Sequence, residues 1–121
     1  ICQALSGKDL TVYGNGEQTR SFCHVSDMIN GLVALLESEI QEPVNLGNPD
    51  ERTITELAEV VLEVTGSNSG ITYEKLPPQD PEVRKPDISK ARMELRWEPE
   101  ITLEQGISNS ISYFKNQLCR R

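Results

Sequence analysis

Apolar residues recur along this chain at two spacings, one typical of helices and the other typical of short strands. The spacing of three to four residues predicts three amphipathic helices, at 28–36, 54–64 and 103–118. Short apolar runs predict four extended segments, at 10–13, 21–25, 43–46 and 71–75. Two further helical pieces are expected at 1–5 and 88–95.

Capping signals indicate where these helices begin. In a capping box, the side chains at the two ends of a four-residue segment each accept the backbone N–H of the other residue. The sequence holds two such boxes, Thr53-x-x-Glu56 and Thr102-x-x-Gln105. Ser26-Asp27 is an N-cap signal for the first long helix, and Asp87 can cap the helix expected at 88–95.

The order of these elements favours an α/β fold, because strands that alternate with helices are typical of that class. Strands of four or five residues do not make a self-sufficient parallel sheet, which usually carries helices on both faces. The run Val44–Leu46 is short and continuous. We therefore expect it to be one strand of a larger sheet, and residues 1–121 to form one incomplete domain.

The overall charge limits the partners that this chain can take. It has 121 residues, of which 19 are acidic and 12 are basic, so its formal net charge is −7. Non-specific nucleic-acid binding needs basic surface that displaces counterions, so we expect no nucleic-acid partner. A small anionic ligand needs only two or three local arginines, and the net charge is compatible with such a ligand.

The cysteines, the histidine and the apolar runs set further limits. Cys2, Cys23 and Cys119 are widely spaced without a CxxC pair, which favours free thiols in a reducing compartment. With His24 as the single histidine, we expect no metal site. No apolar run reaches the roughly 20 residues of a membrane span, so no membrane contact is expected from this segment. A start inside a helix-like stretch leads us to expect a truncated chain.

The segment 11–20 is the first candidate ligand site. Gly14 and Gly16 accept positive φ angles, which lets the backbone turn tightly and approach a ligand. Tyr13 offers a flat face for a base or sugar, and Arg20 offers planar donors that match phosphate oxygens. On spacing alone, an ordinary hairpin loop with a solvated arginine is favoured. The glycine pair lacks the further glycine and the following helix of a dinucleotide fingerprint.

The proline-rich segment 80–87 is the second candidate site. Arg84 can reach a ligand from this stiff loop, although a solvated charged loop is favoured on composition alone. Asn45 can donate its amide to a ligand or to neighbouring backbone. His24 has no serine or cysteine at a telling spacing, and no two carboxylates form a recognisable acid/base pair. The sequence therefore predicts no catalytic residue.

Five motifs follow one another along the chain: LTVYGNGEQTRSFCHVSD, PVNLGNP, TITELAEVV, DPEVRKPDISKAR and LRWEPEITLEQGI. In this order they resemble the C-terminal region of the UDP-glucuronate decarboxylases, which are extended short-chain dehydrogenases/reductases of the NAD-dependent epimerase/dehydratase family. Each motif also occurs in relatives such as dTDP-glucose 4,6-dehydratase. The combination of QTRSF, VNLGNP, RKPDI and WEP is more specific to the decarboxylases.

The resemblance implies a two-part architecture, with a Rossmann-type NAD domain followed by a smaller substrate domain. This chain would supply most of the C-terminal substrate-binding part and a late strand of the Rossmann sheet, Val44–Leu46, with the N-terminal NAD domain absent. The resemblance also implies five substrate-binding residues. Thr11 and Tyr13 would line the nucleotide pocket. Arg20 would contact the diphosphate or lie near the sugar, while Asn45 and Arg84 would help to hold the nucleotide and its phosphates.

The resemblance implies a reaction that converts UDP-glucuronate to UDP-xylose and CO2 through a 4-keto intermediate, with tightly bound NAD as the cofactor. This chemistry needs a Gly-rich phosphate loop and a Tyr-x-x-x-Lys pair. The sequence has no such pair, because the residues four positions after its tyrosines are Glu17, Pro77 and Gln117. We therefore expect NAD to bind to the missing N-terminal part, and this chain alone to bind the UDP end of the substrate weakly and to catalyse nothing.

Two alternatives remain open at the level of sequence. The chain can be a fragment of another nucleotide-sugar epimerase or dehydratase, or a non-catalytic binding module that kept the substrate-domain fold. For the parent enzyme, the resemblance implies a homodimer and a cytoplasmic location, or a Golgi membrane form if the parent is eukaryotic.

Overall fold

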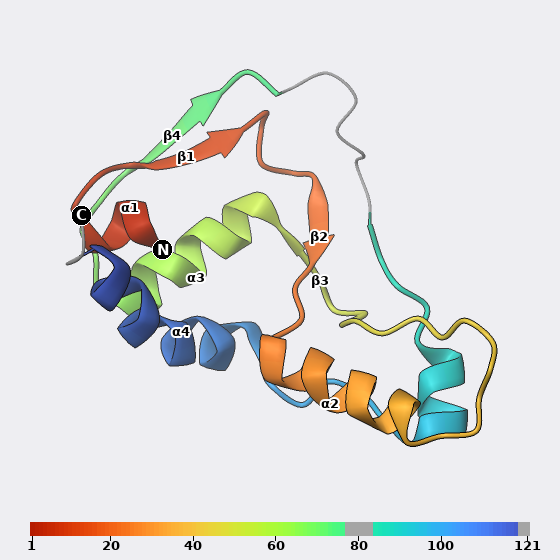
Figure 1. Ribbon diagram of the computed structural model, residues 1–121. Helices are drawn as coiled ribbons and strands as arrows, with labels where there is room; N and C mark the ends of the chain where they lie inside the picture. The colour runs from red at the N-terminus through yellow and green to blue at the C-terminus, as the bar shows by residue number, and fades with distance from the viewer. Residues whose placement is uncertain (77–83, 119–121) are drawn as a thin grey trace.

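The chain folds into two regions that a short two-stranded ribbon connects (Figure 1). The computed structural model describes residues 1–76 and 84–118. The packed region holds α1 (Cys2–Leu5), α3 (Ile54–Thr65), α4 (Leu103–Leu118), β1 (Leu10–Tyr13) and β4 (Ile71–Glu74). The α2 region holds α2 (Val25–Leu36), the π-helix η1 (Ala91–Leu95) and the loop 37–50. The connecting ribbon consists of β2 (Thr19–Ser21) and β3 (Glu51–Thr53). This mixture of helices and strands confirms the α/β class.

In the packed region, α3 lies between the β1–β4 pair on one side and α4 on the other (Figure 1). The two strands are parallel, with Leu10 opposite Ile71. The apolar stripes of the helices and the inward side chains of β1 meet in one core, which buries Ala4, Leu10, Val12, Ala58, Val61 and Ile107. Burial of these side chains is the main contribution to the stability of this region.

Both capping boxes form as the sequence predicts. The Thr53 hydroxyl accepts the N–H of Glu56 at 3.1 Å, and the Glu56 carboxylate accepts the N–H of Thr53 at 2.7 Å. Thr102 and Gln105 make the equivalent pair of bonds at the start of α4, at 3.1 and 3.3 Å. These signals are read correctly from sequence because every partner lies within three residues.

The start of α2 differs from the prediction. The helix begins at Val25, and its N-cap is His24, whose Nδ1 accepts the N–H of Ser26 at 3.2 Å. The prediction of Ser26-Asp27 as the cap was therefore wrong. Asp27 is buried, and its Oδ2 accepts the backbone N–H groups of Glu100 and Ile101 at 3.2 and 2.9 Å. Its carboxylate thus ties α2 to a segment more than 70 residues away in sequence.

Two other element predictions also need correction, and a third is not tested by the described residues. The extended run expected at 21–25 lies earlier in the chain, because β2 covers Thr19–Ser21 and the next residues lead into the His24 cap. The helix expected at 88–95 ends in the wider turns of η1, which Arg96 terminates in the left-handed region at a φ of 51°. The segment 43–46 is in neither sheet. A strand forms only where a neighbouring strand supplies backbone partners, and no described strand lies beside this segment.

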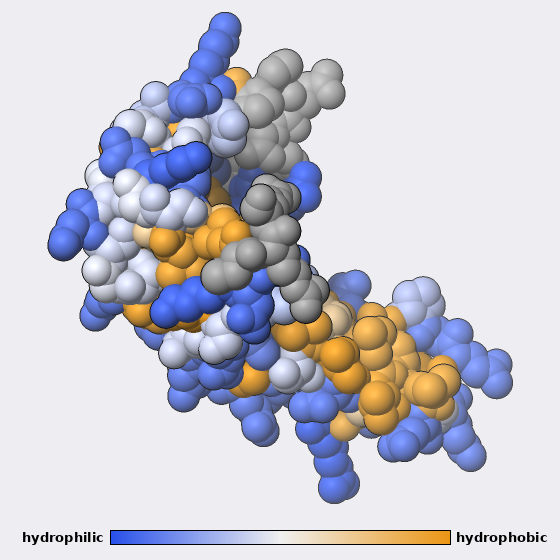
Figure 2. Space-filling view, turned by 60° about the vertical axis from the view of Figure 1, so that its left-hand side comes forward, coloured by the Kyte–Doolittle hydropathy of each residue, from blue (hydrophilic) through white to orange (hydrophobic). Residues whose placement is uncertain are grey.

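The α2 region has a smaller core. Ile88, Ala91 and Trp97 are buried, with Val44, Leu46 and Leu95 packed against them. The Trp97 indole N–H donates to the backbone carbonyl of Asp27 at 3.0 Å. Much of the apolar face of α2 stays in solvent, as the patch of apolar side chains in Figure 2 shows. The exposed apolar residues of this helix, called the α2 stripe below, are Val25, Ile29, Leu32, Val33 and Leu36.

Candidate functional site

The glycine turn at 14–16 joins β1 to β2 and determines where Arg20 lies. Gly14 and Gly16 have φ angles of 74° and 78°, as the sequence predicts for this turn. The carbonyl of Gly16 accepts the N–H of Thr55 at 3.1 Å, which fixes the turn to the first residues of α3. The turn leads into a strand and not into a helix, so it does not fit the phosphates of a dinucleotide such as NAD.

Arg20 and Arg84 line the same cleft, although they are 64 positions apart in the sequence. The cleft has a volume of about 690 Å³. It lies where the end of β2 and the start of α2 meet two loop segments, 46–48 and 84–86. Besides the two arginines, its lining includes the following residues: Ser21, Phe22, Cys23, Met28, Leu46, Gly47, Asn48, Lys85 and Pro86.

Among the described residues that line the cleft, every charged side chain is positive. Arg20, Arg84 and Lys85 contribute side chains, and no acidic residue is among the described residues that line the cleft. Arg20 is half-buried, and its Nη1 donates to the carbonyl of Thr19 at 2.7 Å, whereas Arg84 is exposed. Two guanidinium groups at one cleft suit an anion with several oxygen atoms, because each offers planar, paired donors.

Glu51 is not among the described residues that line the cleft, and it balances the charge of Lys85. Its Oε2 is 3.2 Å from Lys85 Nζ, and its Oε1 accepts the hydroxyl of Thr19 at 3.0 Å. The hydrogen bond from Thr19, followed by that from Lys85, lowers the pKa of Glu51 from its ordinary value of 4.5. Glu51 is therefore an anion at neutral pH and offsets the charge of Lys85.

Cys23 also borders the cleft, as a free thiol. Burial, and to a smaller extent the nearby carboxylate of Asp27, raises the pKa of Cys23 above its ordinary value of 9.0. The side chain therefore stays protonated at neutral pH and is a poor nucleophile.

The other predicted site residues lie outside this cleft. Thr11 is on β1, where its hydroxyl accepts the amide of Gln3 at 3.0 Å. Tyr13, at the end of the same strand, is 47% exposed. The Asn45 amide donates to the backbone carbonyl of Asp87 at 3.2 Å, which is the backbone-satisfying role that the sequence also allowed. The structure thus brings Arg20 and Arg84 together, and it does not bring Thr11, Tyr13 or Asn45 to them.

Sequence reasoning missed several residues at the cleft. Ser21 donates its hydroxyl to the carbonyl of Arg84 at 3.0 Å, and the Asn48 amide donates to the carbonyl of Phe22 at 3.1 Å. Both contacts join distant parts of the chain, so no local sequence pattern predicts them. Lys85 had a signal, because it directly follows Arg84.

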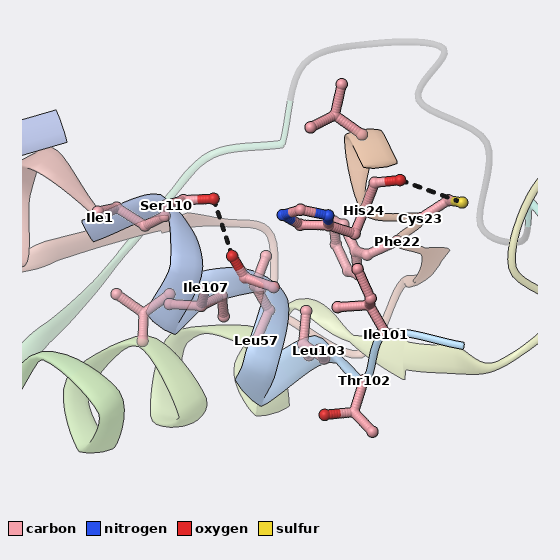
Figure 3. A pocket seen from close by; sticks show the side chains of 13 residues that line it. Ile1, Phe22, Cys23, His24, Leu57, Ile101, Thr102, Leu103, Ile107 and Ser110 are labelled. Atoms are coloured by element: carbon pink, nitrogen blue, oxygen red, sulfur yellow. Dashed lines mark hydrogen bonds between the residues drawn. The ribbon is translucent and has the colours of Figure 1, made fainter. Parts of the chain in front are cut away.

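A second cavity lies between α3, α4 and the residues that lead into α2 (Figure 3). Its volume is about 370 Å³, and its lining is mostly apolar, with Phe22, Leu57, Leu103 and Ile107 among the contributors. His24 is at its wall, where its ring lies close to Gly106 of α4. None of the described residues that line it is an arginine, lysine, aspartate or glutamate, so this cavity is not suited to a phosphate.

In 1–76 and 84–118, no three histidine, cysteine, aspartate or glutamate side chains gather in a way that can hold a metal ion. No helix within the same residues has both the length and the apolar character that crossing a membrane requires.

Comparison with known proteins gives a consistent picture. The sequence profile of the GDP-mannose 4,6-dehydratase family matches residues 1–110. UDP-glucuronic acid decarboxylase 1 of Xenopus tropicalis is 50% identical over 118 residues, which cover 98% of this chain and 28% of that protein. The chain thus spans well under a third of the length of this relative.

Solved structures share the fold. The UDP-glucose 4-epimerase of Thermotoga maritima, solved with UDP-glucose, superposes with a TM-score of 0.90 at 27% identity over 97% of this chain and 38% of its own. The UDP-glucuronic acid 4-epimerase of Bacillus cereus, solved with UDP-glucuronic acid and NAD, superposes with a TM-score of 0.88 at 32% identity. The match covers 96% of this chain and 38% of the epimerase chain. With its profile match, its relatives and its fold in agreement, this chain belongs to the GDP-mannose 4,6-dehydratase family of nucleotide-sugar epimerases and dehydratases.

Proposed function

We propose that this chain is the nucleotide-sugar-binding part of a UDP-glucuronic acid decarboxylase, and that Arg20 and Arg84 together bind the diphosphate of UDP-glucuronate. The complete enzyme releases CO2 from this substrate and forms UDP-xylose. The residues described above bind and orient the UDP end, and the reaction itself takes place on groups outside them. The 50% identity to UDP-glucuronic acid decarboxylases over 98% of the chain supports this assignment.

The observation that carries the proposal is the shared cleft of Arg20 and Arg84. One guanidinium comes from β2 and the other from the loop before η1, so a diphosphate between them is contacted from two sides. A hydrogen bond to a charged group contributes about 1.5–3 kcal/mol net. Since 1.4 kcal/mol corresponds to a tenfold change in affinity, each arginine is expected to strengthen UDP binding by at least about tenfold.

NAD belongs to the proposal as a cofactor of the complete enzyme. The described residues do not fit it, because the glycine turn at 14–16 leads into β2 and lacks the helix whose N-terminus receives a dinucleotide phosphate. We therefore assign NAD to a part of the enzyme outside this chain, together with the residues that transfer protons and hydride. A homodimer and a cytoplasmic location are further expectations for the complete enzyme.

The α2 region supplies a surface for that missing part. The α2 stripe is exposed, with Leu36 at 84%, and the segment 43–46 has no strand beside it. Monomeric proteins rarely expose a contiguous apolar patch of this kind without a partner surface. We assign both features to one incomplete domain, in which Val44–Leu46 joins a larger parallel sheet and the α2 stripe packs against it.

Calorimetric titration with UDP tests the binding proposal. We expect heat of binding from the folded chain, and at least about tenfold weaker binding by Arg20→Ala and by Arg84→Ala. Arg92→Ala is the matched control, because Arg92 lies on η1 outside the cleft and pairs with Glu98. Uridine has no phosphate, so none of the three substitutions should change its binding affinity. If a folded sample gives no heat of binding with UDP, the binding proposal is wrong.

A sister enzyme is the second candidate, since the UDP-glucose 4-epimerase of Thermotoga maritima shares the fold with a TM-score of 0.90. The products of a complete protein that carries this segment distinguish the two. A decarboxylase releases CO2 and UDP-xylose from UDP-glucuronate, whereas an epimerase returns the 4-epimer of the same acid. In the decarboxylase, Arg20→Ala should lower turnover of UDP-glucuronate at least tenfold. If a complete protein forms neither product, that result would instead indicate a non-catalytic binding module.

A further inference from the structure

Four consecutive residues, 84–87, each contact a residue from a distant part of the sequence. The carbonyl of Arg84 accepts the hydroxyl of Ser21, on β2, at 3.0 Å. The ammonium of Lys85 lies 3.2 Å from the carboxylate of Glu51, on β3. The segment therefore has its first two residues fixed to the same two-stranded ribbon that carries Arg20.

The next two residues are held by the loop before β3. The ring of Pro86 lies so close to Gly47 that a Cβ atom there would be 2.9 Å from Pro86 Cγ, a distance that real Cβ atoms essentially never show. Gly47 is itself buried. The carbonyl of Asp87 accepts the amide of Asn45 at 3.2 Å. Only glycine at position 47 permits this approach without a shift of the Arg84-bearing segment.

These contacts have a shared consequence for Arg84. Its side chain is long, exposed and rich in rotamers, so its backbone must be fixed if the guanidinium is to stay at the cleft. Ser21, Asn45 and Gly47 each contact backbone or ring atoms of 84–87, and none of these contacts uses the guanidinium. They fix the start and the end of the segment while leaving the charged group available to a ligand.

We infer that Ser21, Asn45 and Gly47 are positioning residues that hold Arg84 opposite Arg20, and that they act on nucleotide binding through Arg84. This inference rests on the proposed binding of a diphosphate at the cleft. It assigns Asn45 a different task from the direct ligand contact that the sequence resemblance implies. It also explains why a half-buried serine directly follows Arg20 on β2.

The position of Ser21 makes it the sharpest test. Ser21→Ala removes the bond to the Arg84 carbonyl without replacing either arginine. A neutral hydrogen bond of this kind corresponds to about a 2- to 10-fold change in affinity, so UDP should bind that much more weakly. Ser21→Thr keeps the hydroxyl and should restore most of the affinity. Ser112→Ala, at an exposed position of α4, is the matched control and should bind UDP as the unchanged chain does.

A double-substitution cycle separates positioning from a general effect on folding. If Ser21 acts through Arg84, Ser21→Ala should have no further effect on UDP binding once Arg84→Ala is present. The same cycle with Gly47→Ala provides a second, independent variant, for which the shift of Pro86 is expected to weaken binding. Circular dichroism of each variant shows whether it is folded before its titration is interpreted.

The outcomes of this experiment are distinct. Loss of the Ser21→Ala and Gly47→Ala effects in the Arg84→Ala chain supports the inference. If Ser21→Ala and Gly47→Ala weaken UDP binding equally in the unchanged chain and in the Arg84→Ala chain, or in neither, the positioning inference is wrong while the binding proposal stands. Absence of UDP binding by the unchanged, folded chain overturns the proposed function, and the positioning role with it.

Discussion

The packed region and the α2 region contain helices of similar amphipathic pattern but bury them to very different extents. Ile107 of α4 is 6% exposed and Val61 of α3 is 5% exposed, whereas Ile29 of α2 is 52% exposed. In the packed region, the stripes of two helices and one strand cover each other. In the α2 region, the small core around Trp97 covers another side of the helix. A periodic apolar pattern therefore predicts a helix, but it does not tell whether the same chain supplies the surface that covers it.

The two regions also differ in what fixes them. The packed region depends on apolar burial, while α2 is tied to its surroundings by Asp27, whose carboxylate and carbonyl both accept hydrogen bonds from 97–101. A buried carboxyl group needs hydrogen-bond partners, and two backbone N–H groups supply them here. The position of α2, and with it that of the cleft wall formed by Met28, thus rests on a polar anchor.

The largest expected difference comes from one substitution placed in both regions. Ile107→Ala empties part of the packed core and should lower the free energy of unfolding by about 2–5 kcal/mol. Ile29→Ala is the matched control, because it removes the same atoms from a half-exposed position of the α2 stripe. It should change the free energy of unfolding by about 0.5 kcal/mol or less. Urea unfolding followed by circular dichroism measures both. Equal losses would contradict the contrast between the regions.

The second prediction concerns the polar anchor. Asp27→Ala removes the acceptor of the Glu100 and Ile101 N–H groups, and it should lower the free energy of unfolding by about 1.5–3 kcal/mol. Asp27→Asn keeps an oxygen acceptor in the same place and should cost less. The same unfolding experiment compares the two. If asparagine is as damaging as alanine, the backbone hydrogen bonds are not what the anchor contributes.

Substitutions in the α2 stripe are expected to change stability least, but to change self-association clearly. We expect the isolated chain to be marginally stable and to self-associate as its concentration rises, because the stripe is apolar and exposed. Ile29→Ser combined with Leu36→Ser should raise the monomer fraction in light scattering, with little change in unfolding. Asn109→Ser with Asn116→Ser, at exposed positions of α4, is the control. A soluble monomer with a sharp, reversible melt in the unchanged chain would contradict this expectation.

What the sequence predicted well was local. The capping box at Thr53, the turn at Gly14 and Gly16, and the extents of β1 and β4 each depend on residues close in sequence. What it predicted poorly depends on distant partners. Asp27 looked like a cap because the N–H groups that it accepts lie more than 70 residues away. The strand at 43–46 stays a prediction, because no described strand lies beside this segment.

The candidate site shows the same division. Arg20 and Arg84 were singled out for their chemistry and for the motifs around them, and the structure has both at one cleft. Their support could not be foreseen, because Ser21 reaches Arg84 and Asn45 reaches Asp87 across separations of 63 and 42 residues. Thr11 and Tyr13 line up with the family motif, yet β1 holds them away from the arginines, and their contact with a ligand stays a prediction.

Diphosphate binding by the two arginines is tested most directly by a crystal structure of the chain, or of a complete protein that carries it, with UDP bound. We expect guanidinium nitrogens of both Arg20 and Arg84 to lie about 2.7–2.9 Å from diphosphate oxygens, the distance typical of charged hydrogen bonds. A diphosphate that contacts only one of the two arginines, or that lies outside their cleft, would contradict it.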